Sequence, residues 1–115
     1  MNTRVIGSVK EDLSILYLQS NGFEIIERNF KCKIGEIDII AKKDNIIRFI
    51  EVKYRKNTMV GGAYYAINKT KLQKISKIAN YYILTKGLRD YQLSIDALLI
   101  NGEDYEYIEN IYGGM

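Results

Sequence analysis

The chain has 115 residues, a net charge of +3, one cysteine and no histidine, a composition that fits a single folded domain over residues 1–115. The absence of histidine excludes Ser-His-Asp and Cys-His catalysis, and a single cysteine excludes an internal disulfide. No apolar run is long enough to cross a membrane, and the N-terminus lacks the apolar core of a signal peptide, so we expect a cytoplasmic protein without membrane contact.

Charge is unevenly distributed along the chain. Residues 28–77 contain 13 Lys and Arg residues against four acids, a net charge of +9, so the remaining residues together carry −6. A basic stretch that encloses a few acids is typical of a metal-dependent enzyme acting on phosphate backbones. A solvated basic surface is the alternative interpretation of the same charges.

The first third of the chain predicts a helix followed by a strand. Ser8 and Glu11 have the spacing of a helix-capping box, and apolar residues follow at helical intervals until Asn21-Gly22. Residues 23–30 predict the first strand, and residues 31–34 connect it to the next one.

Two further strands carry alternating charged and aliphatic residues. In residues 35–41, the alternation sends Glu36 and Asp38 to one face of the sheet and Ile37 and Ile39 to the other. Residues 50–53 continue the same pattern on the following strand. Acids at such positions between apolar neighbours favour a functional site over a solvated sheet face.

The turn between these strands fixes which residues oppose one another. A two-residue hairpin loop at Asp44-Asn45 places Asp38 opposite Glu51 and Glu36 opposite Lys53. Because opposed Cβ atoms are roughly 4.5–5.5 Å apart, Asp38 and Glu51 can reach one hard divalent cation, with a lysine alongside.

The second half of the chain predicts a loop, a helix and a hairpin. Residues 56–65 have no period and predict a loop, and Thr70 or Asn68 caps a helix that ends near Lys86-Gly87. The apolar stripe of this helix consists of Leu72, Ile75, Ile78, Ala79, Tyr82 and Ile83. Residues 92–100 and 105–111 predict strands around Asn101-Gly102. The order α-β-β-β-α-β-β therefore predicts an α/β sandwich with a central mixed sheet flanked by helices.

These motifs together resemble a known family. The two segments 35–41 (GEIDIIA) and 49–55 (FIEVKYR) are similar to the signature of the YraN-like bacterial proteins, which belong to the PD-(D/E)xK, or restriction-endonuclease-like, superfamily. The archaeal Holliday junction resolvases share this pattern. Further landmarks of the resemblance are Glu11, Tyr17-Leu18, Gly22, Arg28-Asn29, Lys71, Ala79, Tyr82 and Asp96. Ser94 departs from the arginine usual in the family, and Lys10 departs from a common glycine.

The resemblance implies a metal site. In the superfamily the equivalents of Asp38, Glu51 and the carbonyl of Val52 bind Mg²⁺, with Mn²⁺ as a substitute, and Lys53 takes the place of the catalytic lysine. Glu36 is either a third acidic ligand or the ion-pair partner of Lys53 across the hairpin.

Glu11 has two interpretations. It is either the glutamate of a capping box or, as in resolvase-like nucleases, a helix carboxylate near the metal with a catalytic role.

The function expected from this resemblance is hydrolysis of phosphodiester bonds by a Mg²⁺-dependent DNA endonuclease, branched DNA included. Arg55 is placed to grip a phosphate, and Arg28, Lys71 and Lys74 are candidate DNA contacts, although a solvated helix face that includes Lys77 is the alternative for the helix lysines. The runner-up is a non-catalytic nucleic-acid-binding module of the same fold. The resolvase likeness also implies a homodimer.

One further pair of residues lies in the predicted loop. Tyr64 and Tyr65 either anchor this loop or stack on unpaired bases.

Overall fold

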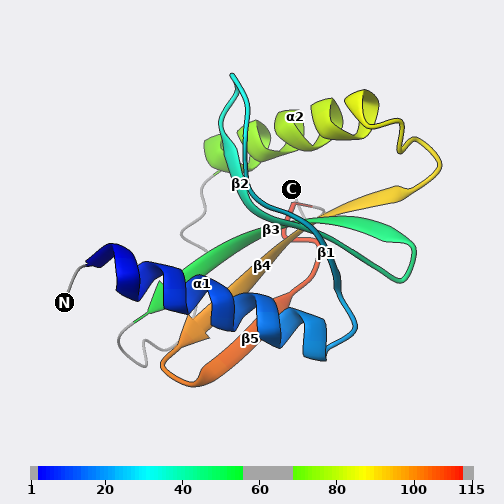
Figure 1. Cartoon of the computed structure of the whole chain (residues 1–115). Helices are drawn as coiled ribbons and strands as arrows, with labels where there is room; N and C mark the ends of the chain where they lie inside the picture. The colour runs from blue at the N-terminus through cyan, green and yellow to red at the C-terminus, as the bar shows by residue number, and fades with distance from the viewer. Residues whose placement is uncertain (1–2, 56–68, 113–115) are drawn as a thin grey trace.

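The computed structural model describes residues 3–55 and 69–112, and its elements follow the predicted order (Figure 1). The elements are α1 (Thr3–Ser20), β1 (Glu24–Lys31), β2 (Glu36–Lys43), β3 (Ile46–Arg55), α2 (Lys69–Thr85), β4 (Gln92–Asn101) and β5 (Asp104–Ile108). The strands form one sheet in the order β1-β2-β3-β4-β5, in which only β3 and β4 are parallel. The predicted α/β sandwich with a mixed sheet is therefore confirmed.

The two helices cover opposite faces of the sheet, and each face has its own apolar core. The predicted stripe of α2 is buried in full against residues of β2, β3 and β4. Beneath α1, Ile15 and Leu18 pack on Ile39, Ile50 and other buried residues of the opposite face. Because both faces are covered, the inner strand β4 is buried continuously over residues 95–100.

The β2–β3 hairpin has the predicted register. Asp44 and Asn45 have φ angles of 57° and 63°, the left-handed conformation that a type I′ turn needs at both central residues. The ladder runs from Lys43 opposite Ile46 to Ile39 opposite Ile50. This register brings Asp38 and Glu51 to the point where the ladder ends.

Several predicted boundaries were wrong. The helix α1 begins at Thr3, so Ser8 lies inside it and is not a cap. Thr70 likewise lies inside the first turn of α2, and Asn68 is outside the described residues. The last hairpin turns one residue later than predicted, with Asn101 paired to Asp104.

Neither described helix is long and apolar enough to cross a membrane. The loop predicted over residues 56–65, with Tyr64 and Tyr65, lies outside the described residues.

Candidate metal centre

The strands β2 and β3 separate at Asp38. Continuing their register would pair Ile37 with Val52, but the ladder stops at Ile39 and Ile50. Instead, the Val52 N–H donates a 2.8 Å hydrogen bond to Oδ2 of Asp38. A carboxylate thus replaces a backbone acceptor, which fixes the Asp38 side chain in the gap between the two strands.

At the separation of β2 and β3, the β2 side chains also depart from the expected alternation between the two faces of the sheet. Ile37 packs in the cluster beneath α2, whereas Ile39 packs in the cluster beneath α1. The predicted alternation, with Ile37 and Ile39 on one face, is therefore wrong. The regular pleat is interrupted between them, where the Asp38 carboxylate takes the place of a backbone acceptor and Asn29 on the paired strand β1 has a φ angle of 53°.

Glu51 lies on β3 beside this gap and meets a lysine from α2. Its side chain is nearly buried, and the Lys71 ammonium forms a 3.0 Å ion pair with Oε1 of Glu51. The helix α2 therefore delivers a positive charge directly to the acidic site.

The environment of Asp38 disfavours an uncompensated negative charge. The pKa of Asp38 is raised to about 6: burial is the largest cause, and the nearby charges of Glu51 and Glu36 act in the same direction. The Val52 hydrogen bond and the Lys71 ammonium act in the opposite direction. A cation bound here would relieve the same penalty.

Two lysines lie beside the carboxylates. Lys53 follows Glu51 by two residues and so leaves the same face of β3. Burial and then the adjacent Lys71 ammonium lower the pKa of Lys53. Burial also acts to lower the pKa of Lys71, but the hydrogen bond to Glu51 and its charge outweigh this and raise it. The more readily deprotonated amine is therefore that of Lys53.

A small pocket of about 90 Å³ opens on the α1 side of Asp38. Its lining residues are Glu11, Ser14, Ile15, Arg28, Asn29, Asp38, Ile39, Val52 and Tyr54. Ser14 and Tyr54, whose hydroxyl oxygens are 3.3 Å apart, were not predicted as site residues, because no motif links an α1 serine to a β3 tyrosine.

Glu11 reaches this pocket from the middle of α1. Because α1 begins at Thr3, the capping-box interpretation of Glu11 is wrong. Its carboxylate lies 3.6 Å from the Arg28 guanidinium and 3.5 Å from the Asn29 amide. The pocket thus has a second carboxylate in addition to Asp38.

The donors in this site suit Mg²⁺ better than a metal with many protein ligands. Among the described residues, no three His, Cys, Asp or Glu side chains are grouped to hold a metal. Mg²⁺ keeps several waters and commonly uses one or two carboxylates, a demand that Asp38, Glu51 and the Val52 carbonyl can meet. Glu36 is exposed, and its part as a third ligand stays a prediction, as does its pairing with Lys53.

The predicted DNA contacts have different surroundings. Arg28 forms a 2.9 Å ion pair with Asp12, so its guanidinium is already paired with an acid of α1. Lys74 is exposed, whereas Lys71 contacts Glu51 as described above. The side chain of Arg55 lies outside the described part of the protein. These four assignments remain predictions.

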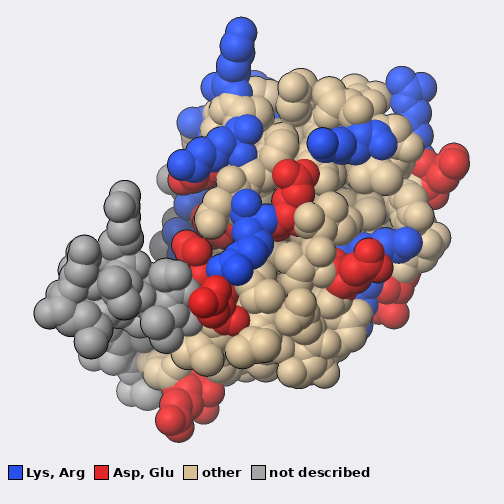
Figure 2. Space-filling model, viewed as in Figure 1, with Lys and Arg blue, Asp and Glu red and all other residues tan. Residues whose placement is uncertain are grey.

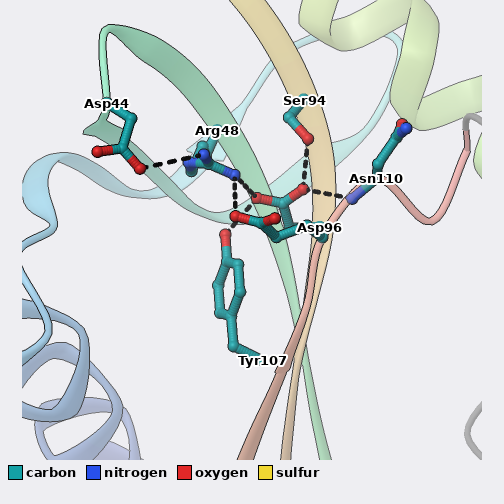
Figure 3. Close-up of polar contacts among 7 residues, drawn as sticks. Asp44, Arg48, Ser94, Asp96, Tyr107 and Asn110 are labelled. Atoms are coloured by element: carbon teal, nitrogen blue, oxygen red, sulfur yellow. Dashed lines mark hydrogen bonds and ion pairs between the residues drawn. The ribbon is translucent and has the colours of Figure 1, made fainter.

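A second polar cluster, centred on Asp96, is structural (Figure 3). The fully buried Asp96 carboxylate forms a 3.0 Å ion pair with Arg48. It also accepts hydrogen bonds from the hydroxyls of Ser94 and Tyr107 and from the Asn110 N–H. The Arg48 guanidinium also lies 3.2 Å from the Glu109 carboxylate, so contacts of Arg48 and Asp96 link β3, β4 and the segment around β5, and we assign the cluster to holding them together.

Comparisons with known proteins give one consistent result. The uncharacterised protein family UPF0102 matches residues 10–100. A UPF0102 protein of Fusobacterium nucleatum is 46% identical over 114 residues, which cover 99% of this chain and 96% of that protein. UPF0102 proteins of a Sulfurovum species and of Neisseria meningitidis are 44% and 43% identical, over 94% and 93% of this chain and 94% of each relative.

Proposed function

This chain belongs to the uncharacterised protein family UPF0102, and from that premise we propose that it is a Mg²⁺-dependent nuclease of the restriction-endonuclease-like superfamily that hydrolyses phosphodiester bonds in DNA. The observation that carries the proposal is the separation of β2 and β3 at Asp38, next to a cluster of charges in which Glu51 and Lys71 shift the pKa of Asp38 and Lys71 and Glu51 shift that of Lys53. The motif resemblance to the PD-(D/E)xK nucleases and to the archaeal Holliday junction resolvases supports it.

The chemistry would divide among these residues. Asp38, Glu51 and the Val52 carbonyl would hold Mg²⁺, which when bound would polarise the phosphodiester and lower the pKa of a water. Lys53, whose pKa is lowered, would orient that water and, in its neutral amine form, accept its proton. Lys71 keeps its charge and would offset the negative charge that develops on the phosphate oxygens.

A cleavage assay tests the proposal directly. The substrates are linear duplex, single-stranded, flapped and four-way DNA, each with Mg²⁺, Mn²⁺ or EDTA. We expect metal-dependent cleavage that is lost in Lys53→Ala and Asp38→Ala, whereas Glu103→Gln, which changes an exposed acid in the last hairpin, retains it. Cleavage that survives undiminished in Lys53→Ala and Asp38→Ala would contradict the assignment.

A second candidate is a nucleic-acid-binding module that does not cleave. The Glu51–Lys71 ion pair favours it, because Glu51 is already neutralised without a metal. Calorimetric titration separates the two: the module would bind no Mg²⁺ or Mn²⁺ and yet bind DNA with a steep salt dependence.

The homodimer belongs to the same proposal, since symmetric cutting of branched DNA requires two active sites. Light scattering on the protein with and without four-way DNA tests it.

A further inference from the structure

A basic groove lies at the other end of α2 from the metal centre. It has a volume of about 590 Å³ and runs between the β1–β2 connection and the last turn of α2. The lining residues are Phe30, Lys31, Cys32, Lys33, Ile34, Tyr81, Thr85 and Lys86. Three of these are lysines and none is acidic, so the groove has a single sign of charge and would attract a polyanion.

Aromatic rings accompany the charges in the groove. Tyr81 is 45% exposed, whereas the next residue, Tyr82, is buried. Phe30 is fixed by an edge-to-face contact with Tyr82 at 5.1 Å between ring centroids. Lysines beside an exposed ring are the combination that binds single-stranded nucleic acid, because phosphates meet ammonium groups while an unpaired base stacks.

A continuous stripe on α2 connects the groove with the metal centre. Lys74, Lys77, Tyr81 and Thr85 are spaced by three and four residues and therefore lie along one side of the helix. This side faces the β1–β2 connection, since a Cβ built on Gly35 would lie 3.4 Å from the Lys74 side chain.

The stripe starts beside Lys71, the residue that pairs with Glu51, and runs roughly 20 Å along the helix to Thr85. In Figure 2, the charged side chains in the upper part of the molecule, where Figure 1 shows α2 and the β1–β2 hairpin, are mainly Lys and Arg.

We infer that this groove binds the single-stranded portion of a nucleic acid, with Tyr81 stacking on a base and Lys31, Lys33 and Lys86 contacting phosphates. The inference rests on the proposed function and deepens it: the preferred substrates carry an unpaired strand that extends about six nucleotides from the scissile phosphate, at the 3.4 Å rise of a stacked strand. A blunt duplex has no free base to offer Tyr81.

Cys32 makes the groove accessible to a direct experiment. It is the chain's single cysteine, is partly exposed and lines the groove, so its reaction rate with a thiol reagent reports occupancy. The full-length protein, in EDTA to prevent cleavage, is treated with the reagent in the presence of an oligothymidylate of about 12 nucleotides. At an oligonucleotide concentration ten times Kd, we expect the Cys32 rate to fall by about tenfold.

Three exposed residues provide matched variants. Tyr81→Ala should raise the Kd of the oligonucleotide by about tenfold, and Tyr81→Phe should restore binding because it keeps the ring. Lys86→Gln should weaken binding, whereas Arg89→Gln, an equal change of charge at an exposed residue outside the groove, should do so far less.

Three results would overturn the inference: an oligonucleotide that fails to bind, one that binds while Cys32 reacts at its free rate, or equal protection by blunt duplex or polyglutamate. Failure of the nuclease proposal would appear elsewhere, as absent metal binding and absent cleavage, because Cys32 protection is measured without metal.

Discussion

At the scale of single residues, the fold opposes the ionisation of the Asp38 carboxyl. The Val52 N–H stabilises its charge, yet burial, Glu51 and Glu36 together destabilise it. A folded-state pKa of about 6 against the ordinary 3.8 means that the native protein holds this proton more tightly than the unfolded chain does. Stability from this group is therefore greatest below pH 3.8 and falls as the pH rises towards 6.

The upward shift of the Asp38 pKa predicts that Asp38→Asn stabilises the metal-free protein at neutral pH. The amide keeps an oxygen for the Val52 N–H and removes the charge, so the free energy of unfolding should rise by about 2 kcal/mol, after a discount for partial exposure. Urea denaturation in EDTA, at neutral pH and near pH 4, measures the free energy of unfolding of the variant and the wild type. The gain should disappear at the lower pH, and a gain of equal size at both would contradict this explanation. Glu103→Gln is the exposed control.

Lys71 also makes a prediction at this scale. Because its ammonium is 3.0 Å from Glu51, a metal must displace it, so Lys71→Met should tighten Mn²⁺ binding by about tenfold. Lys74→Met, which removes the same charge three residues further along α2, should change Kd much less. Calorimetry in which both variants match the wild type would show that Lys71 does not compete for the site.

At the scale of elements, some features that set the strand pairing can be predicted from the sequence and others cannot. The β2–β3 register could be predicted because Asp44-Asn45 determines it locally, through a turn that needs two left-handed residues. The bond from Val52 to Asp38 could not, since a side chain there replaces a backbone partner. The start of α1 was missed because the spacing of Ser8 and Glu11 also occurs within a helix.

The Asp96 cluster could not be predicted from the sequence either. Arg48 lies opposite Ser94 in the β3–β4 register and supplies a guanidinium to Asp96, so the missing arginine at residue 94 has a structural counterpart on the neighbouring strand. A sequence pattern cannot reveal such a pair, because its members come from strands that are distant in the chain.

Removing one member of this buried pair should be costly. Arg48→Met leaves the Asp96 charge without its main partner and should lower the free energy of unfolding by about 3 kcal/mol. The double variant Arg48→Met/Asp96→Asn should recover part of that loss, since no charge then remains buried. Chemical denaturation of the set tests this, and a single variant within about 1 kcal/mol of wild type would show that the pair is not needed.

At the scale of the whole molecule, the uneven charge along the sequence corresponds to a spatial arrangement. Basic side chains extend from Lys71 at the candidate metal centre through Lys74 and Lys77 to the groove at the end of α2. The sequence located this basic segment, and the residues of the carboxylate site, but not the groove, because the groove forms only where the β1–β2 connection packs against α2.

This arrangement predicts a steep salt dependence of single-strand binding. If the three groove lysines together with Lys74 and Lys77 contact phosphates, log Kd should rise with log salt concentration with a slope of about 3.5. Replacing both Lys74 and Lys77 by Gln should reduce that slope by about 1.4, whereas Arg89→Gln should leave it nearly unchanged. Fluorescence anisotropy across a salt series measures all three, and an identical slope in the double variant would place the strand elsewhere.

The measurement that tests the central claim most directly is calorimetric titration of the metal-free protein with Mg²⁺ and Mn²⁺. If Asp38 and Glu51 together hold one divalent cation, the wild type binds one ion per chain, and Asp38→Ala and Glu51→Ala each abolish binding. Glu103→Ala, which removes an exposed acid from the last hairpin, should retain it. Binding that survives in Asp38→Ala or Glu51→Ala, or no binding in the wild type, would contradict the account.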